Sequence, residues 1–97
     1  MPKGYWIITF RAVTDASKLE RYIELAAPVL AAASAKFIVR GMPARVYEAG
    51  VPERTVVIAF ESVEQAIEVY ESAAYQASVA ALGDGAERDV RVMPGLE

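Results

Sequence analysis

The chain has 97 residues, with ten basic and thirteen acidic side chains and with neither cysteine nor histidine. The missing cysteine excludes disulfides, thiolate metal sites and a cysteine nucleophile, and the missing histidine removes the commonest general base, metal ligand and haem ligand. The formal net charge of −3 is spread along the chain without a basic cluster, so neither nucleic acid nor an anionic membrane surface is an expected partner.

This length predicts a single domain over residues 1–97. The most apolar helical stretch, residues 25–35, is shorter than the roughly 20 residues that cross a bilayer. Residues 1–4 lack the apolar core of a secretory signal, so a cytoplasmic protein is expected.

A first strand is predicted over residues 5–13, because YWIITFRAV is rich in β-branched and aromatic side chains. Side chains alternate between the two faces of a strand. One predicted face is wholly apolar and consists of Trp6, Ile8, Phe10 and Ala12. The other face mixes apolar and polar side chains and consists of Tyr5, Ile7, Thr9, Arg11 and Val13.

A helix is predicted to follow, with Asp15 as its N-cap. Apolar residues at helical spacing form its expected core stripe, with Tyr22 and Val29 flanking it: Leu19, Ile23, Ala26, Leu30 and Ala33. Pro28 lies inside this pattern and predicts a kink or a break, since proline removes one backbone hydrogen bond.

Residues 36–40 (KFIVR) predict a second strand, residues 41–43 a bend, and residues 44–48 (ARVYE) further strand. The pattern fits either one bulged strand or a tight hairpin. Residues 55–61 give the clearest strand, with Val56, Ile58 and Phe60 on its large apolar face.

Ser62 is the expected cap of the next helix and forms a capping-box pattern with Gln65. Ser72 is expected to restart a helical turn that Gly83 and the following two residues end. Residues 89–93 (DVRVM) predict a short final strand.

The predicted order β-α-β-β-α-β is that of a ferredoxin-like α+β sandwich, in which both helices cover one face of an antiparallel sheet. The opposite face has no helix, yet it is too apolar for water. Its expected apolar members are Tyr5, Ile7, Val13, Val57 and Ala59. A homodimer that packs two such sheet faces together is therefore expected.

Four segments resemble the bacterial family called domain of unknown function 1330. They are GYWI at residues 4–7, FIVRG at 37–41, RTVVIAF at 54–60 and YESAAYQ at 70–76. The resemblance covers nearly the whole chain and implies a dimeric α+β barrel, while it implies little about activity.

The chain departs from this family's pattern at three places. Ala74 stands where the family has an acidic residue before its Tyr-Gln pair, Ser34 and Ala35 stand for a Gly-Gly pair, and Met42 stands for a second glycine. A mechanism that used the acidic residue is therefore not expected here.

Six residues are candidates for ligand binding. Arg40 at a strand end is either an anion clamp or the partner of a nearby carboxylate. Tyr75 and Ser72 either bind a ligand or serve as core and helix cap. Thr9, Arg11 and Tyr47 either line a pocket or belong to the open sheet face.

No cofactor or metal site is expected, because carboxylates are scattered and the phosphate-loop pattern is missing. The expected function is binding of a small organic ligand, either anionic or neutral, between sheet and helices. The alternative is a cofactor-free isomerase or monooxygenase-like enzyme, in which a shifted Glu, Asp or Lys replaces histidine as the base.

Overall fold

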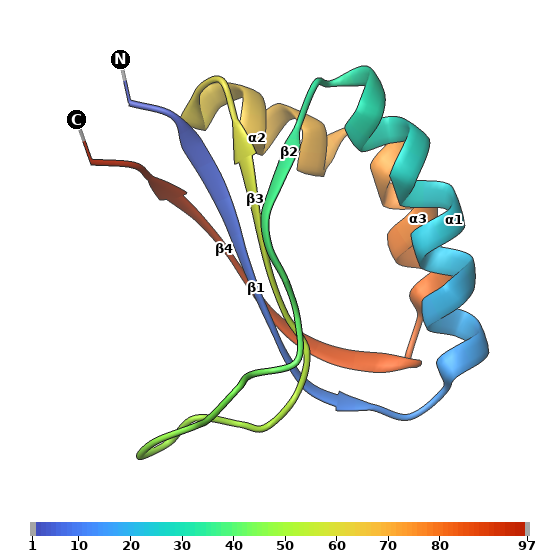
Figure 1. Ribbon diagram of the computed structural model, residues 1–97. Helices are drawn as coiled ribbons and strands as arrows, with labels where there is room; N and C mark the ends of the chain where they lie inside the picture. Colours follow the sequence, from blue (N-terminus) through green and yellow to red (C-terminus); the bar gives the residue numbers. More distant parts are fainter. Residues whose placement is uncertain (1, 97) are drawn as a thin grey trace.

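A four-stranded antiparallel sheet with all its helices on one face makes up the fold (Figure 1). A computed structural model describes residues 2–96. The elements are β1 (Gly4–Val13), α1 (Ala16–Ala32), β2 (Lys36–Gly41), β3 (Thr55–Phe60), α2 (Val63–Glu71), α3 (Ala73–Leu82) and β4 (Ala86–Pro94). The strand order β2-β3-β1-β4 is that of a ferredoxin-like sheet.

The core lies between this sheet and the helices, and its strand residues are those that the alternation predicts. Trp6, Ile8 and Phe10 of β1 and Val56, Ile58 and Phe60 of β3 are all buried. The Trp6 indole Nε1 donates a 2.8 Å hydrogen bond to the carbonyl of Ala66, so its one polar atom is satisfied. The predicted helix-facing side of the sheet is confirmed.

A β-bulge at Arg11 corrects the prediction for the end of β1. Phe10 pairs with Arg88, but Ala12 pairs with Glu87 and Val13 with Ala86. The extra residue reverses the alternation beyond it. Val13 therefore packs against the core, although the simple period-two pattern placed it on the open face.

Helix α1 begins as predicted, with Asp15 Oδ1 accepting hydrogen bonds from the backbone nitrogens of Ser17 and Lys18. The predicted stripe is buried at Ala26 and Leu30, as expected. Nearer the start of the helix the buried residue is Tyr22 instead of Ile23, which is 41% exposed.

Pro28 does not interrupt α1, so the predicted break is wrong. Proline leaves the carbonyl four residues earlier without its helical donor. Both Pro28 and Glu24 are exposed, so water can satisfy that carbonyl.

Residues 42–54 form no strand, which corrects the expectation of strand at 44–48. β2 ends at Gly41, and its bulge lies at Ile38, between the paired residues Phe37 and Val39. The β-favouring pair Val46 and Tyr47 finds no partner strand there, and both residues stay exposed. The segment projects from the end of the sheet as a long loop (Figure 1).

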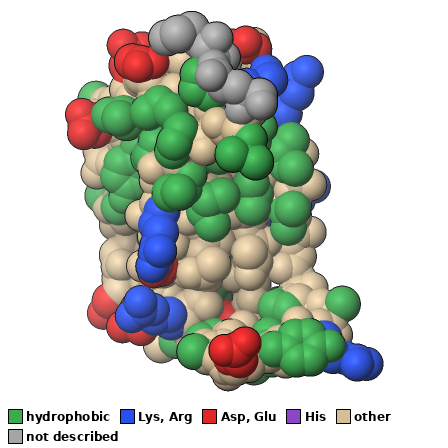
Figure 2. All heavy atoms as spheres, turned by 90° about the vertical axis from the view of Figure 1, so that its left-hand side faces the viewer, with side chains coloured by type: hydrophobic (Ala, Val, Ile, Leu, Met, Phe, Trp, Pro, Cys, Tyr) green, Lys and Arg blue, Asp and Glu red, His purple; other side chains and the backbone are tan. Residues whose placement is uncertain are grey.

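The sheet face opposite the helices is apolar in one half and polar in the other (Figure 2). Strand pairing places Tyr5 beside Ala59 and Met93, and Ile7 beside Val57. The next row along the strands holds Thr9 and Asp89, and the bulge residue Arg11 follows. Within residues 2–96, no helix has the length and apolar character needed to cross a membrane.

Candidate functional site

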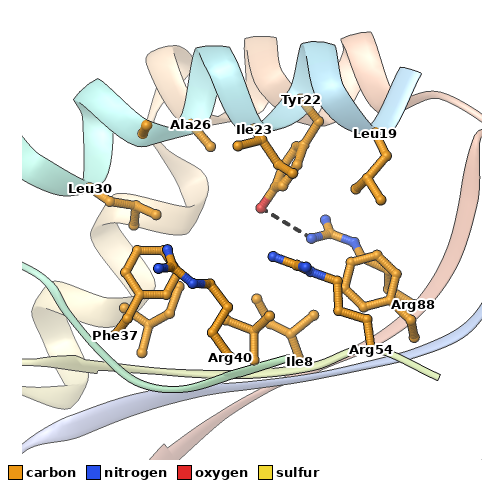
Figure 3. A pocket seen from close by; sticks show the side chains of 14 residues that line it. Ile8, Leu19, Tyr22, Ile23, Ala26, Leu30, Phe37, Arg40, Arg54 and Arg88 are labelled. Atoms are coloured by element: carbon orange, nitrogen blue, oxygen red, sulfur yellow. Dashed lines mark hydrogen bonds between the residues drawn. The ribbon is translucent and has the colours of Figure 1, made fainter. Parts of the chain in front are cut away.

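A pocket of about 110 Å³ lies between α1 and the sheet (Figure 3). Its wall on the sheet side is built from apolar core positions of the two central strands, Ile8, Val56 and Ile58. The helix contributes Leu19, Tyr22, Ile23, Ala26, Ala27 and Leu30. Such a lining suits the apolar body of a small molecule.

Three arginines point into this apolar pocket: Arg40 of β2, Arg54 immediately before β3, and Arg88 of β4 (Figure 3). Strand register explains their common face. Arg40 pairs with the buried Val56, Arg54 precedes Val56 by two residues, and Arg88 pairs with the buried Phe10.

None of the lining residues in the described part of the chain is acidic. Within residues 2–96, no ion pair joins Arg40, Arg54 or Arg88 to a carboxylate. Guanidinium groups remain protonated at every physiological pH. The pocket therefore concentrates positive charge that the described side chains do not neutralise.

Aromatic rings hold two of the guanidinium groups in place. Arg88 Nη1 donates a 3.1 Å hydrogen bond to the Tyr22 hydroxyl, and its Cζ lies 4.7 Å from the Tyr22 ring centre. The Arg40 Cζ lies 4.7 Å from the centre of the Phe37 ring. Cation–π contacts of this kind fix a guanidinium while leaving its N–H donors available.

Arg54 is anchored through its backbone. The Phe10 nitrogen donates a 2.9 Å hydrogen bond to the Arg54 carbonyl, which extends the β1–β3 ladder by one residue pair. Arg54 and Arg88 therefore lie on either side of Phe10 in one cross-strand row. Figure 3 shows both side chains directed toward the Tyr22 hydroxyl.

Tyr75 lies behind the pocket rather than in its wall. Its ring is fully buried, and its hydroxyl shares a 2.5 Å hydrogen bond with the Tyr22 hydroxyl. Burial, together with the contact to Tyr22, raises the pKa of the Tyr75 phenol well above its ordinary value. Tyr75 is thus a neutral group that holds the Tyr22 oxygen in position beside Arg88.

Ser72 is the N-cap of α3. Of its two predicted roles, ligand binding and helix capping, the structure shows capping. Its Oγ accepts a 3.2 Å hydrogen bond from the Tyr75 nitrogen and donates a 2.7 Å bond to the Val69 carbonyl. The extended backbone of Ser72 separates α2 from α3.

Replacement of Ser72 by alanine is expected to lower the free energy of unfolding by about 1 kcal/mol, because a capping hydroxyl is lost. Urea denaturation measures this difference. The affinity for pocket ligands should stay unchanged, and a drop in affinity without a drop in stability would contradict the capping role.

Thr9, Arg11 and Tyr47 lie together in a different groove, on the far side of the sheet beneath the 42–54 loop. Arg11 Nη2 is 3.5 Å from Asp89 Oδ2, and Asp89 is also hydrogen-bonded to Arg91. The Arg91 hydrogen bond, with Arg11 contributing, lowers the pKa of Asp89. Arg11 is therefore paired with a carboxylate, unlike the three pocket arginines, while a second arginine, Arg45, also lines this groove.

Of the six predicted candidates, the pocket contains Arg40 alone. Sequence reasoning missed Tyr22, Arg54 and Arg88, although extending the predicted strands by one residue would have found both arginines. In the described part of the chain, no group of three or more acidic, histidine or cysteine side chains is placed to hold a metal ion.

Residues 3–96 match the family whose description is domain of unknown function (DUF1330). The chain belongs to this family. The predicted family and its ferredoxin-like fold are therefore confirmed. None of the curated proteins matches the sequence closely enough to count as a relative.

Solved structures similar to this DUF1330 chain share its fold at low sequence identity. A protein of unknown function from Rhodopseudomonas palustris has a TM-score of 0.73 at 13% identity, covering 99% of this chain and 84% of that one. SnoaB, a cofactor-independent oxygenase from Streptomyces nogalater, has a TM-score of 0.66 at 11% identity, covering 100% and 96%. A dimeric ferredoxin-like protein of unknown function from Thermobifida fusca has a TM-score of 0.63 at 16% identity, covering 96% and 91%.

Proposed function

We propose that this protein binds a small organic anion in the pocket between α1 and the sheet. The observation that carries the proposal is the set of three arginines, Arg40, Arg54 and Arg88, in a pocket whose described lining has no acid. An anionic group can accept charge-assisted hydrogen bonds from the guanidinium groups. The apolar remainder of the ligand would replace water against Ile8 and Ala26.

Binding would also relieve repulsion among the pocket arginines. Arg54 and Arg88 are half-buried, whereas Arg40 is exposed. Like charges repel most strongly where the surroundings have a low dielectric, so the repulsion is greatest between Arg54 and Arg88. A bound anion turns that repulsion into attraction. The pocket should therefore discriminate strongly between a carboxylate and a neutral molecule of the same shape.

Hexanoate and its neutral isostere hexanamide test the proposal directly. In isothermal titration calorimetry at low ionic strength, hexanoate is expected to bind at least about tenfold more tightly, since hydrogen bonds to charged groups are worth about 1.5–3 kcal/mol. At 100 times its dissociation constant, hexanoate should stabilise the fold by about 2.7 kcal/mol. Equal affinities, or no binding of hexanoate, would contradict the proposal.

A cofactor-free enzyme has less support from these residues. Proton transfer near neutral pH would need a lining carboxylate or amine, and the described lining offers only guanidinium groups and the Tyr22 phenol. The likeness to SnoaB concerns the fold, at 11% identity. Binding without catalysis therefore fits the pocket better.

We further propose that two copies pair through the open sheet face. Its apolar half includes Val39, which pairs with Val57, and Met93, which pairs with Tyr5; their exposed fractions are 48% and 46%. Two sheets packed face to face would bury this surface in a closed, two-fold dimer. The similar protein from Thermobifida fusca is dimeric. Because the pocket lies on the helix side, each copy would keep its own binding site.

A further inference from the structure

The charges of the pocket fall into two groups. Arg54 and Arg88 share the cross-strand row of Phe10, and both point toward the Tyr22 hydroxyl. Arg40 belongs to the row of Val56, two residues farther along the sheet, and lies over Phe37 (Figure 3). Two residues along a strand correspond to about 6.6 Å.

From this arrangement we propose that the natural ligand is a small dicarboxylate, held by its two ends. This inference rests on the proposed function and names its ligand class. One carboxylate would lie between Arg54 and Arg88, where the Tyr22 hydroxyl is also within reach, and the other would pair with Arg40.

The surface between the two charged groups favours a hydrocarbon linker. The floor there is Ile8 and Val56, and α1 covers it with Ile23 and Ala26. A polar linker would lose hydration against these side chains without gaining hydrogen bonds, whereas methylene or vinyl groups are stabilised by contact with them.

The separation of the charged groups sets the length of that linker. Strand rows two residues apart lie about 6.6 Å apart, which is on the order of the distance between the carboxyl carbons of an extended six-carbon dicarboxylate. The pocket of about 110 Å³ would hold the hydrocarbon linker, and its Arg40 end is open to solvent, since Arg40 and Phe37 are exposed. A phosphate group carries its charge at a single point and would leave either Arg40 or the Arg54–Arg88 pair without a partner.

A ligand with two negative charges also compensates three arginines better than a ligand with one negative charge does. A monocarboxylate leaves two guanidinium groups uncompensated in the pocket, and the second carboxylate removes part of that repulsion. The gain should therefore depend on Arg40 specifically, since Arg40 stands apart from the other two.

Adipate and monomethyl adipate test this inference separately from the proposed function. They have the same six-carbon chain, but adipate carries two carboxylates and the ester only one. Titration calorimetry of the full chain is expected to give adipate about 10- to 100-fold tighter binding than monomethyl adipate. In Arg40→Gln the ratio of the two affinities should fall to about 1. Arg21→Gln is the matched control, because Arg21 is an exposed arginine of α1 that pairs with Glu24.

Three results would overturn the dicarboxylate inference while leaving anion binding intact: equal affinities for the two compounds, a ratio that Arg40→Gln does not change, or tighter binding of inorganic phosphate than of adipate. If neither adipate nor monomethyl adipate binds, both the inference and the proposed function are wrong. Arg21→Gln must keep the preference for adipate over monomethyl adipate. If this control also lost the preference, the change in net charge alone would explain the result for Arg40→Gln.

Discussion

Arg88→Gln is expected to weaken the binding of hexanoate by about 10- to 100-fold. Arg88 is the pocket arginine that is fixed most firmly, since its guanidinium donates to the Tyr22 hydroxyl and lies against the Tyr22 and Phe10 rings. Glutamine keeps a hydrogen-bond donor at this position but removes the charge. The lost affinity should therefore report the electrostatic contribution of a preorganised guanidinium.

Calorimetry of the variant measures this effect, and thermal unfolding without ligand shows whether the fold has survived. Tyr22 keeps its bond to Tyr75 in the variant, so the tyrosine pair remains satisfied. Arg21→Gln, which removes an exposed arginine of α1 outside the pocket, should bind hexanoate as the unsubstituted chain does. If a folded Arg88→Gln protein bound hexanoate as tightly as the unsubstituted protein, Arg88 would not belong to the binding site.

Val57→Glu is expected to convert a dimer into monomers, raising the dimer dissociation constant by at least about a thousandfold. Val57 lies on the open face between Ile7 and Val39, so a carboxylate there would have apolar neighbours across both strand pairs. A two-fold interface receives the substitution twice, and each buried charge carries a desolvation penalty of several kcal/mol. In the monomer the same side chain reaches water, so the fold should persist.

Val57→Thr is the matched control, because threonine is β-branched and uncharged and should leave most of the protein dimeric. Sedimentation equilibrium at micromolar concentration, with circular dichroism as a check on folding, distinguishes the variants. A monomeric unsubstituted protein would exclude the sheet-face dimer, and so would a dimer that tolerates Glu at position 57.

The arrangement of the sheet could be predicted because period-two alternation is a strong local signal. Trp6, Ile8 and Phe10, with Val56 and Ile58, were assigned to the helix-covered face and are buried there. Capping chemistry likewise placed the start of α1 at Asp15 and the break before α3 at Ser72, because each side chain bonds backbone groups close to it in sequence.

The pocket was missed because strand ends carry little local signal. β3 was predicted from Thr55 and β4 from Asp89, so Arg54 and Arg88 each lay one residue outside a predicted strand. Continuing the alternation would have put both on the buried face. Charged side chains on such a face look like a strand boundary until the apposed helix is known.

Tertiary contacts decided the remaining differences. Tyr22 and Ile23 are both apolar enough to face the core. The way α1 packs on the sheet buries Tyr22, whose hydroxyl is hydrogen-bonded to Tyr75 and Arg88. Strand-favouring residues around Tyr47 form no strand because no partner strand lies beside them. Neither outcome could be read from one segment alone.

The side-chain Nε–Hε resonances of arginine, followed by ¹⁵N NMR during titration with adipate, test the central claim most directly. If the ligand binds between α1 and the sheet, the signals of Arg40, Arg54 and Arg88 shift together and saturate with one dissociation constant. The signals of Arg11 and Arg45, which line the groove on the far side of the sheet, stay in place. Shifts confined to Arg11 and Arg45, or no shift at the three pocket arginines, would contradict the account.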